Sequence, residues 1–64
     1  MNRVGQVWES FYHSDIFVVV EPAEVTSDGW YQHQILSLTR DERRTWGEHP
    51  QGAWETSDLM RRIA

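Results

Sequence analysis

Three histidines are the first residues that could do chemistry, because histidine binds metal ions and transfers protons near neutral pH. They are His13, His33 and His49. They fall in three separate segments, and no second histidine or carboxylate stands at a known ligand spacing from any of them. The chain has no cysteine, so a thiolate zinc site is excluded. We therefore predict that the protein has no metal site and no cofactor.

Serine, histidine and aspartate all occur, but the sequence does not place them in a known catalytic motif. The sequence contains no nucleophile elbow, no phosphate-binding glycine loop and no pair of carboxylates in a known catalytic motif. A domain of 64 residues also has little room for a substrate pocket of roughly 300–1,000 Å³. The sequence predicts that the protein is not an enzyme, with no catalytic residue and no small-molecule substrate. Catalysis in the shared pore of an oligomer is the remaining alternative.

The aromatic residues are numerous enough to supply both a core and a surface. Four tryptophans, two tyrosines and two phenylalanines exceed what one small core needs. Trp8, Phe17 and one of Trp46 or Trp54 are predicted to be buried. The remaining rings are therefore available for binding.

Two pairs of adjacent rings are the predicted partner-binding residues. Neighbouring side chains on a strand point in opposite directions, so the rings of Trp30 and Tyr31 cannot both face the core. Phe11 and Tyr12 flank a predicted turn in the same manner. Exposed aromatic residues are common anchors of protein interfaces, and we expect these rings to serve in this way.

Arginine supplies all the basic side chains, and Arg43 and Arg44 complete the predicted partner-binding set. If the fourth and last strands are neighbours, Arg40, Arg43 and Arg44 join Arg61 and Arg62 in one basic patch. The alternative is a solvated face in which carboxylates neutralise the arginines. Arginine without lysine is typical of GC-rich coding sequences, which suggests a phage or another mobile element as the source.

Frequent turn signals divide the chain into short segments, which favours an all-β fold. The expected strands cover residues 3–10, 15–25, 30–38, 43–48 and 53–55. Residues 57–63 form either a short 3-10 turn followed by a final strand or a short helix. The strand is favoured, since so short a helix is unstable by itself. We expect one domain over residues 1–64.

The details of three strands follow from side-chain type. Residues 15–25 should form the most buried strand, with its pairing interrupted at Pro22, which has no backbone donor. Asp28 and Gly29 predict a hairpin turn. In the strand that follows, we expect the end containing Leu36 and Leu38 to face the core.

This order of elements resembles the Src-homology-3-like small barrels. The segment Gly5-Gln6-Val7-Trp8 precedes a long hydrophobic strand, a hairpin and a polar fourth strand. A short helical turn at Ser57-Asp58-Leu59 then leads to a terminal strand ending at Ile63. The resemblance implies a five-stranded Src-homology-3-like small barrel with a short 3-10 or helical turn near the C-terminus.

Two motifs of this class are missing. The chain has neither the Ala-Leu-Tyr-like and Pro-x-x-Tyr stretches of the peptide-binding signalling domains nor the Val-Gln-Ile-Tyr stretch of the type II dihydrofolate reductases. The resemblance therefore implies neither proline-rich peptide binding nor reductase activity.

The net charge and the length of the apolar segments limit where the protein can be located and what it can bind. A net charge of −4 disfavours a nucleic-acid footprint. The longest apolar run, residues 16–20, is too short to cross a bilayer, and no signal-peptide pattern is present, so we expect a cytoplasmic protein without a membrane partner. We expect a small, non-catalytic interaction module that binds a host protein or self-associates through its aromatic and arginine residues. The alternative is a nucleic-acid-associated small barrel that uses an arginine patch.

Overall fold

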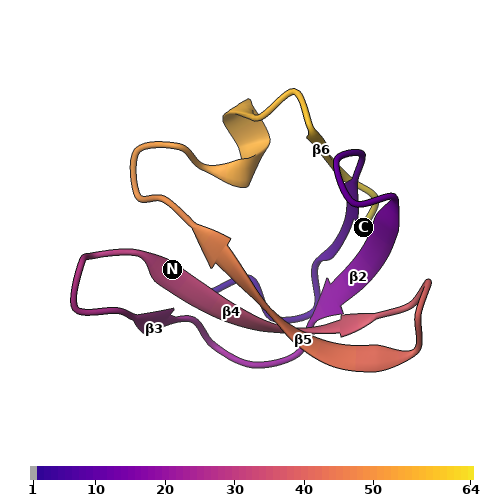
Figure 1. The fold of residues 1–64 in the computed structure, drawn as a ribbon, viewed down its shortest axis with the longest axis horizontal. Helices are drawn as coiled ribbons and strands as arrows, with labels where there is room; N and C mark the ends of the chain where they lie inside the picture. The colour runs from indigo at the N-terminus through magenta and orange to yellow at the C-terminus, as the bar shows by residue number, and fades with distance from the viewer. Residues whose placement is uncertain (1) are drawn as a thin grey trace.

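One antiparallel sheet of six strands makes up the fold in the computed structural model, which describes residues 2–64 (Figure 1). The elements are β1 (Val7–Ser10), β2 (Asp15–Val19), β3 (Glu24–Val25), β4 (Tyr31–Ser37), β5 (Glu42–Glu48), the 3-10 helix η1 (Trp54–Thr56) and β6 (Met60–Arg62). The predicted all-β class is confirmed. No helix in residues 2–64 is long and apolar enough to cross a membrane.

The number and bounds of the strands differ from the prediction at two places. The strand expected over residues 15–25 ends at Val19, and a separate strand of two residues, β3, follows the break around Pro22. The interruption at Pro22 is thus confirmed, and the count of five strands becomes six. Gly29 adopts a positive φ of 87° in the turn between β3 and β4, as the predicted hairpin requires.

The strand predicted over residues 53–55 is wrong, because this segment forms η1. The Trp54 N–H donates to the side chain of Glu48, and the Thr56 N–H donates to the Ala53 carbonyl within the helical turn. These bonds take the place of a strand ladder. The C-terminal segment forms a strand, β6, which pairs with β1, so the alternative of a helix beginning at Ser57 is also wrong.

The strand order leaves β5 and β6 at the two ends of a curled sheet, and the two-residue strand β3, which pairs only with β4, as a further short edge. The order is β3-β4-β2-β1-β6, and β5 pairs with the opposite edge of β4. Figure 1 shows the segment after β5 running through η1 and then turning back to β6. Across residues 2–64, β5 and β6 do not pair, so backbone hydrogen bonds do not close the sheet.

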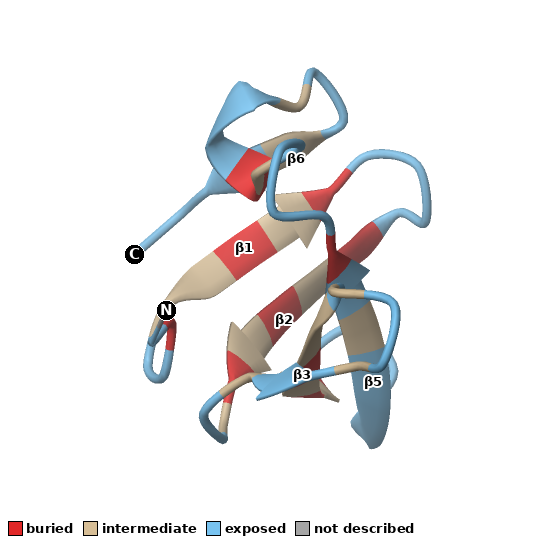
Figure 2. Ribbon diagram, turned by 90° about the vertical axis from the view of Figure 1, so that its left-hand side faces the viewer, coloured by how far each residue is buried: buried red, intermediate tan, exposed pale blue. Residues whose placement is uncertain are grey.

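The core lies on the concave side of this sheet. Trp8, Phe17, Val19, Ile35 and Trp54 are buried, which confirms the predicted burial of Trp8 and Phe17. Each such side chain contributes about 1.5–3 kcal/mol by leaving water. Figure 2 shows the buried residues alternating along β1 and β2, while β5 is mostly exposed.

The buried face of β4 is opposite to the predicted one. His33, Ile35 and Ser37 face the interior, whereas Leu38 is 53% exposed. The reason is that the polar side chains on this face have buried partners. The Ser37 hydroxyl donates to Asp15 at 2.7 Å, and His33 contacts Glu48 at 2.8 Å. These partners come from other strands, so an alternation of apolar residues within β4 could not reveal them.

Candidate partner-binding surface

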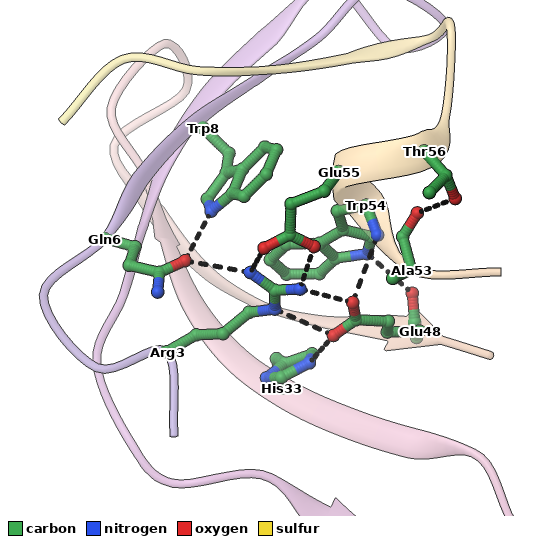
Figure 3. Close-up of polar contacts among 10 residues, drawn as sticks. Arg3, Gln6, Trp8, His33, Glu48, Ala53, Trp54, Glu55 and Thr56 are labelled. Atoms are coloured by element: carbon green, nitrogen blue, oxygen red, sulfur yellow. Dashed lines mark hydrogen bonds and ion pairs between the residues drawn. The ribbon is translucent and has the colours of Figure 1, made fainter. Parts of the chain in front are cut away.

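An ionic cluster connects the beginning of the chain to β5 across the opening of the sheet (Figure 3). Arg3 lies before β1 and donates two hydrogen bonds to the carboxylate of Glu48 at the end of β5, at 2.8 and 2.6 Å. Glu55 of η1 accepts two further bonds from the same guanidinium, at 2.9 and 2.6 Å. The guanidinium also lies 5.2 and 4.9 Å from the ring centroids of Trp8 and Trp54. Side chains therefore connect β5 and η1 to the segment before β1.

The environment of the cluster favours its charged state. Burial alone would raise the pKa of Glu48, but hydrogen bonds from Arg3, Trp54 and His33 outweigh burial and hold that pKa below its usual 4.5. The hydrogen bond from Arg3 likewise lowers the pKa of Glu55. Burial opposes the charge on Arg3, but its bonds to Glu55 and Glu48 raise its pKa above the ordinary value.

His33 and Glu48 form a histidine–carboxylate pair, which in an accessible site could transfer protons. Both side chains are fully buried. The His33 Nε2 faces Glu48, while its Nδ1 has no hydrogen-bond partner among residues 2–64. The pair joins β4 to β5 in the interior of the sheet.

The outer edge of β5 carries unpaired backbone groups, as the pattern of hydrogen bonds in β4 shows. The Leu38 N–H donates to Ile16 of β2, and the Val20 N–H donates to the Gln34 carbonyl. Even-numbered residues of β4 therefore direct their backbone groups toward β2, and odd-numbered residues direct theirs toward β5. In the β4–β5 register, Ile35 is opposite Arg44. Even-numbered residues of β5 thus bond to β4.

The odd-numbered residues of β5, which are Arg43, Thr45 and Gly47, consequently direct their N–H and C=O groups away from the sheet. A second observation agrees with this assignment, because the Gly47 carbonyl accepts a hydrogen bond from the indole Nε1 of Trp54 at 3.3 Å. The backbone groups of Arg43 and Thr45 have no partner in another segment of residues 2–64. The edge is seven residues long and open at its centre.

Three open hollows adjoin this edge. The first, of about 230 Å³, lies between the β1–β2 turn, β5 and the segment around η1, and Tyr12, His13, Trp46 and Met60 are among its lining residues. A second, of about 310 Å³, shares His13 and Trp46 and adds Thr45. The third, of about 480 Å³, lies by the β3–β4 hairpin. Gly47 lines all three, so β5 runs through the centre of the hollowed surface.

The predicted binding residues lie around this surface. Tyr12 is 75% exposed and lines the first hollow, and Phe11, half exposed, precedes it in the same turn. Trp30 is 43% exposed and Tyr31 is half-buried, and both line the third hollow. Arg44 lines the second. The two ring pairs are therefore not in one cluster but stand on either side of β5.

The condition for a single basic patch is not met, because β6 is not a neighbour of β5, which carries Arg43 and Arg44 and follows Arg40. Ion pairs also neutralise four of the exposed arginines, while Arg62 donates to the Ala64 carbonyl. These pairs are Arg40–Asp15, Arg43–Glu21, Arg44–Glu42 and Arg61–Glu9. The alternative of a solvated and internally neutralised face describes the structure better.

Sequence reasoning missed Thr45 and Gly47. A glycine within a strand signals that another group approaches closely, and Trp30 lies 3.5 Å from the position that a Cβ of Gly47 would occupy. That signal was present in the sequence. For Thr45 there was none, because its importance depends on which direction its backbone faces.

No cluster of three histidine, aspartate or glutamate side chains that could hold a metal ion occurs in residues 2–64. The absence of a metal and of a cofactor stays a prediction from the sequence. Comparisons with protein-family models, with curated proteins and with solved structures found no match for this chain.

Proposed function

We propose that this chain is a small, non-catalytic protein-interaction module, and that its partner lies along the outer edge of β5. The observation that carries the proposal is the open backbone edge of Arg43 and Thr45, with exposed rings on both sides. An unpaired edge of this length is a ready template for another strand, and proteins usually cover or blunt such an edge. Here it adjoins three hollows.

The rings supply the remaining contacts. Tyr12 and Trp30 are large, partly exposed and anchored in short turns, so little conformational entropy is lost when they are covered. An extended partner that pairs with β5 would place alternate side chains toward the hollows on the two sides of the strand. This arrangement uses Tyr12, Trp30 and Tyr31 together with Arg44, all of which line the hollows.

We also propose the finer architecture, a Src-homology-3-like small barrel. Its support is the curled sheet whose open side is bridged by Arg3, Glu48 and Glu55, with a 3-10 helix before the last strand. A cytoplasmic location and a phage or mobile-element source stay predictions from the sequence. The nucleic-acid alternative is not proposed, because carboxylates neutralise Arg43, Arg44 and Arg61.

Affinity capture with matched variants tests the function. The immobilised wild-type chain should retain one dominant protein, or a second copy of itself, at stoichiometric yield. Tyr12→Ser and Trp30→Ser should each lose this partner. Val4→Ser is the control, because Val4 is similarly exposed but lines none of the three hollows. Equal capture by all four chains, or no association by the wild type, would contradict the proposal.

A further inference from the structure

The backbone edge of β5 has a geometry that a second β5 can complete. An antiparallel neighbour must present residues whose N–H and C=O groups point outward, opposite residues of the same kind. In this chain these are Arg43, Thr45 and Gly47. An identical strand running in the opposite direction offers the same set in reverse order.

We propose that two copies of this chain pair antiparallel through β5, with Thr45 opposite Thr45 of the second copy at a two-fold axis. This inference rests on the proposed function, since it assigns a partner to the same edge. The two Thr45 residues exchange both of their backbone hydrogen bonds. On either side, Arg43 and Gly47 form the next hydrogen-bonded pair, in which the Gly47 N–H of one copy donates to the Arg43 carbonyl of the other and the Arg43 N–H donates to the Gly47 carbonyl. That carbonyl also accepts from the Trp54 indole, and its two lone pairs accommodate both donors.

The side chains in this register are complementary. Arg44 stands opposite Trp46 in a non-hydrogen-bonded pair, where the side chains approach most closely. Trp46 is half-buried in one copy, so part of its ring is available to the guanidinium. Arg43 stands opposite Gly47, which has no side chain to obstruct it. Trp30 packs over Gly47 and presents a partly exposed ring to the arriving arginine.

Neighbouring registers are less favourable. Shifting one strand along the other in one direction places Arg44 opposite Arg44 of the second copy, and a larger shift places Arg43 opposite Arg43. Like charges then meet at the two-fold axis. A shift in the other direction makes the central bonds depend on the Gly47 carbonyl, which already accepts from Trp54. In the proposed register the like-charged pair is Glu42 and Glu48, and Glu48 is buried and neutralised by Arg3 within its own chain.

The strength of such a dimer follows from its size. Two short strands and a few flanking side chains form an interface at or below the small end of specific complexes, about 1,200 Å². A weak dimer is expected, with a dissociation constant between about 1 µM and 1 mM. The association should therefore depend on protein concentration.

Sedimentation equilibrium of three chains tests the register. Thr45→Val keeps the backbone N–H and should dimerise like the wild type. Thr45→Pro removes an N–H that points away from β4, a position where proline is tolerated in an edge strand. It should raise the dissociation constant by at least about tenfold, because the central pair of bonds is lost. Circular dichroism must show that each variant keeps the wild-type fold.

A second measurement needs no variant. In a mixed sample of isotope-labelled and unlabelled wild-type chains, isotope-filtered nuclear Overhauser effects should connect Thr45 with Thr45 and Arg44 with Trp46 between copies. A wild-type chain that is monomeric at about 1 mM overturns the inference. So does a dimer whose intermolecular contacts lie away from β5. If self-pairing fails but capture of another protein still depends on Tyr12 and Trp30, the inference fails while the proposed function stands.

Discussion

Glu48 joins the end of β5 to three other segments of the chain. Its carboxylate accepts hydrogen bonds from Arg3 and from the Trp54 N–H, and it contacts His33. These partners come from the start of the chain, from η1 and from β4. One carboxylate therefore fixes the end of β5 relative to three other segments. Burial makes its charge costly, and the bonds offset that cost.

Removing this charge should be far more damaging than removing its exposed neighbour. Glu48→Gln leaves Arg3 buried with fewer ionic partners and should cost about 3–5 kcal/mol. A domain of this size has a total stability of about 3–10 kcal/mol. Glu55→Gln is the matched control, since that side chain is 54% exposed and should cost about 0–1 kcal/mol. Urea unfolding measures both, and equal losses would contradict a structural role for the buried pair.

The same two glutamates predict acid sensitivity. Their pKa values are lowered in the folded state relative to the usual 4.5, so the unfolded chain binds protons first as the pH falls. The stabilisation is complete well above pH 4.5 and is lost as the pH falls through the folded pKa values. Thermal unfolding from pH 7 to pH 3 should show a melting temperature that declines below about pH 5. A melting temperature constant over this range would be inconsistent with the lowered values.

At this scale the sequence predicted the apolar core but not the ionic cluster. Trp8 and Phe17 were identified because burying a large ring is favourable in almost any fold. Arg3 and Glu48 are separated by 45 positions and follow no local pattern, so only the fold brings them together. Their residue types alone favour the surface.

Among the elements, β4 and β5 show most clearly what the pattern of side chains in a strand can and cannot predict. The predicted face of β4 was wrong because the prediction depended on Leu36 and Leu38, whose apolar side chains suggested burial. His33 and Ser37 occupy the interior instead because β5 and β2 supply their partners. For β5 the extent was predicted within a residue, but the direction of its backbone groups depends on its register with β4.

The assignment of backbone direction in β5 can be tested by proline substitution at neighbouring positions. Thr45→Pro removes an outward N–H and should leave most of the stability intact. Arg44→Pro removes an N–H that bonds to β4 and should cost about 3 kcal/mol or more. Both side chains are exposed, so lost packing does not explain the difference. Thermal unfolding monitored by circular dichroism gives the comparison, and a greater loss for Thr45→Pro would reverse the assignment.

At the scale of the whole molecule, the open side of the sheet and the open edge of β5 have the same origin. Backbone pairing stops at β5, and the cluster around Arg3 joins this strand to the rest of the molecule without using its central backbone groups. The chain thus combines a fixed outer strand with unpaired hydrogen-bonding groups. Rigid presentation of such an edge reduces the entropy lost on binding.

Amide hydrogen exchange along β5 tests this account most directly, in dilute solution and again in the associated state. In the dilute free chain, the amides of Arg43, Thr45 and Gly47 should exchange rapidly, while those of Arg44 and Trp46 should be protected by β4. On association with a second copy or another partner, Thr45 and Gly47 should become protected. Protection of Thr45 in the dilute free chain, or association that leaves Thr45 and Gly47 unprotected, would contradict the claim that this edge is the binding surface.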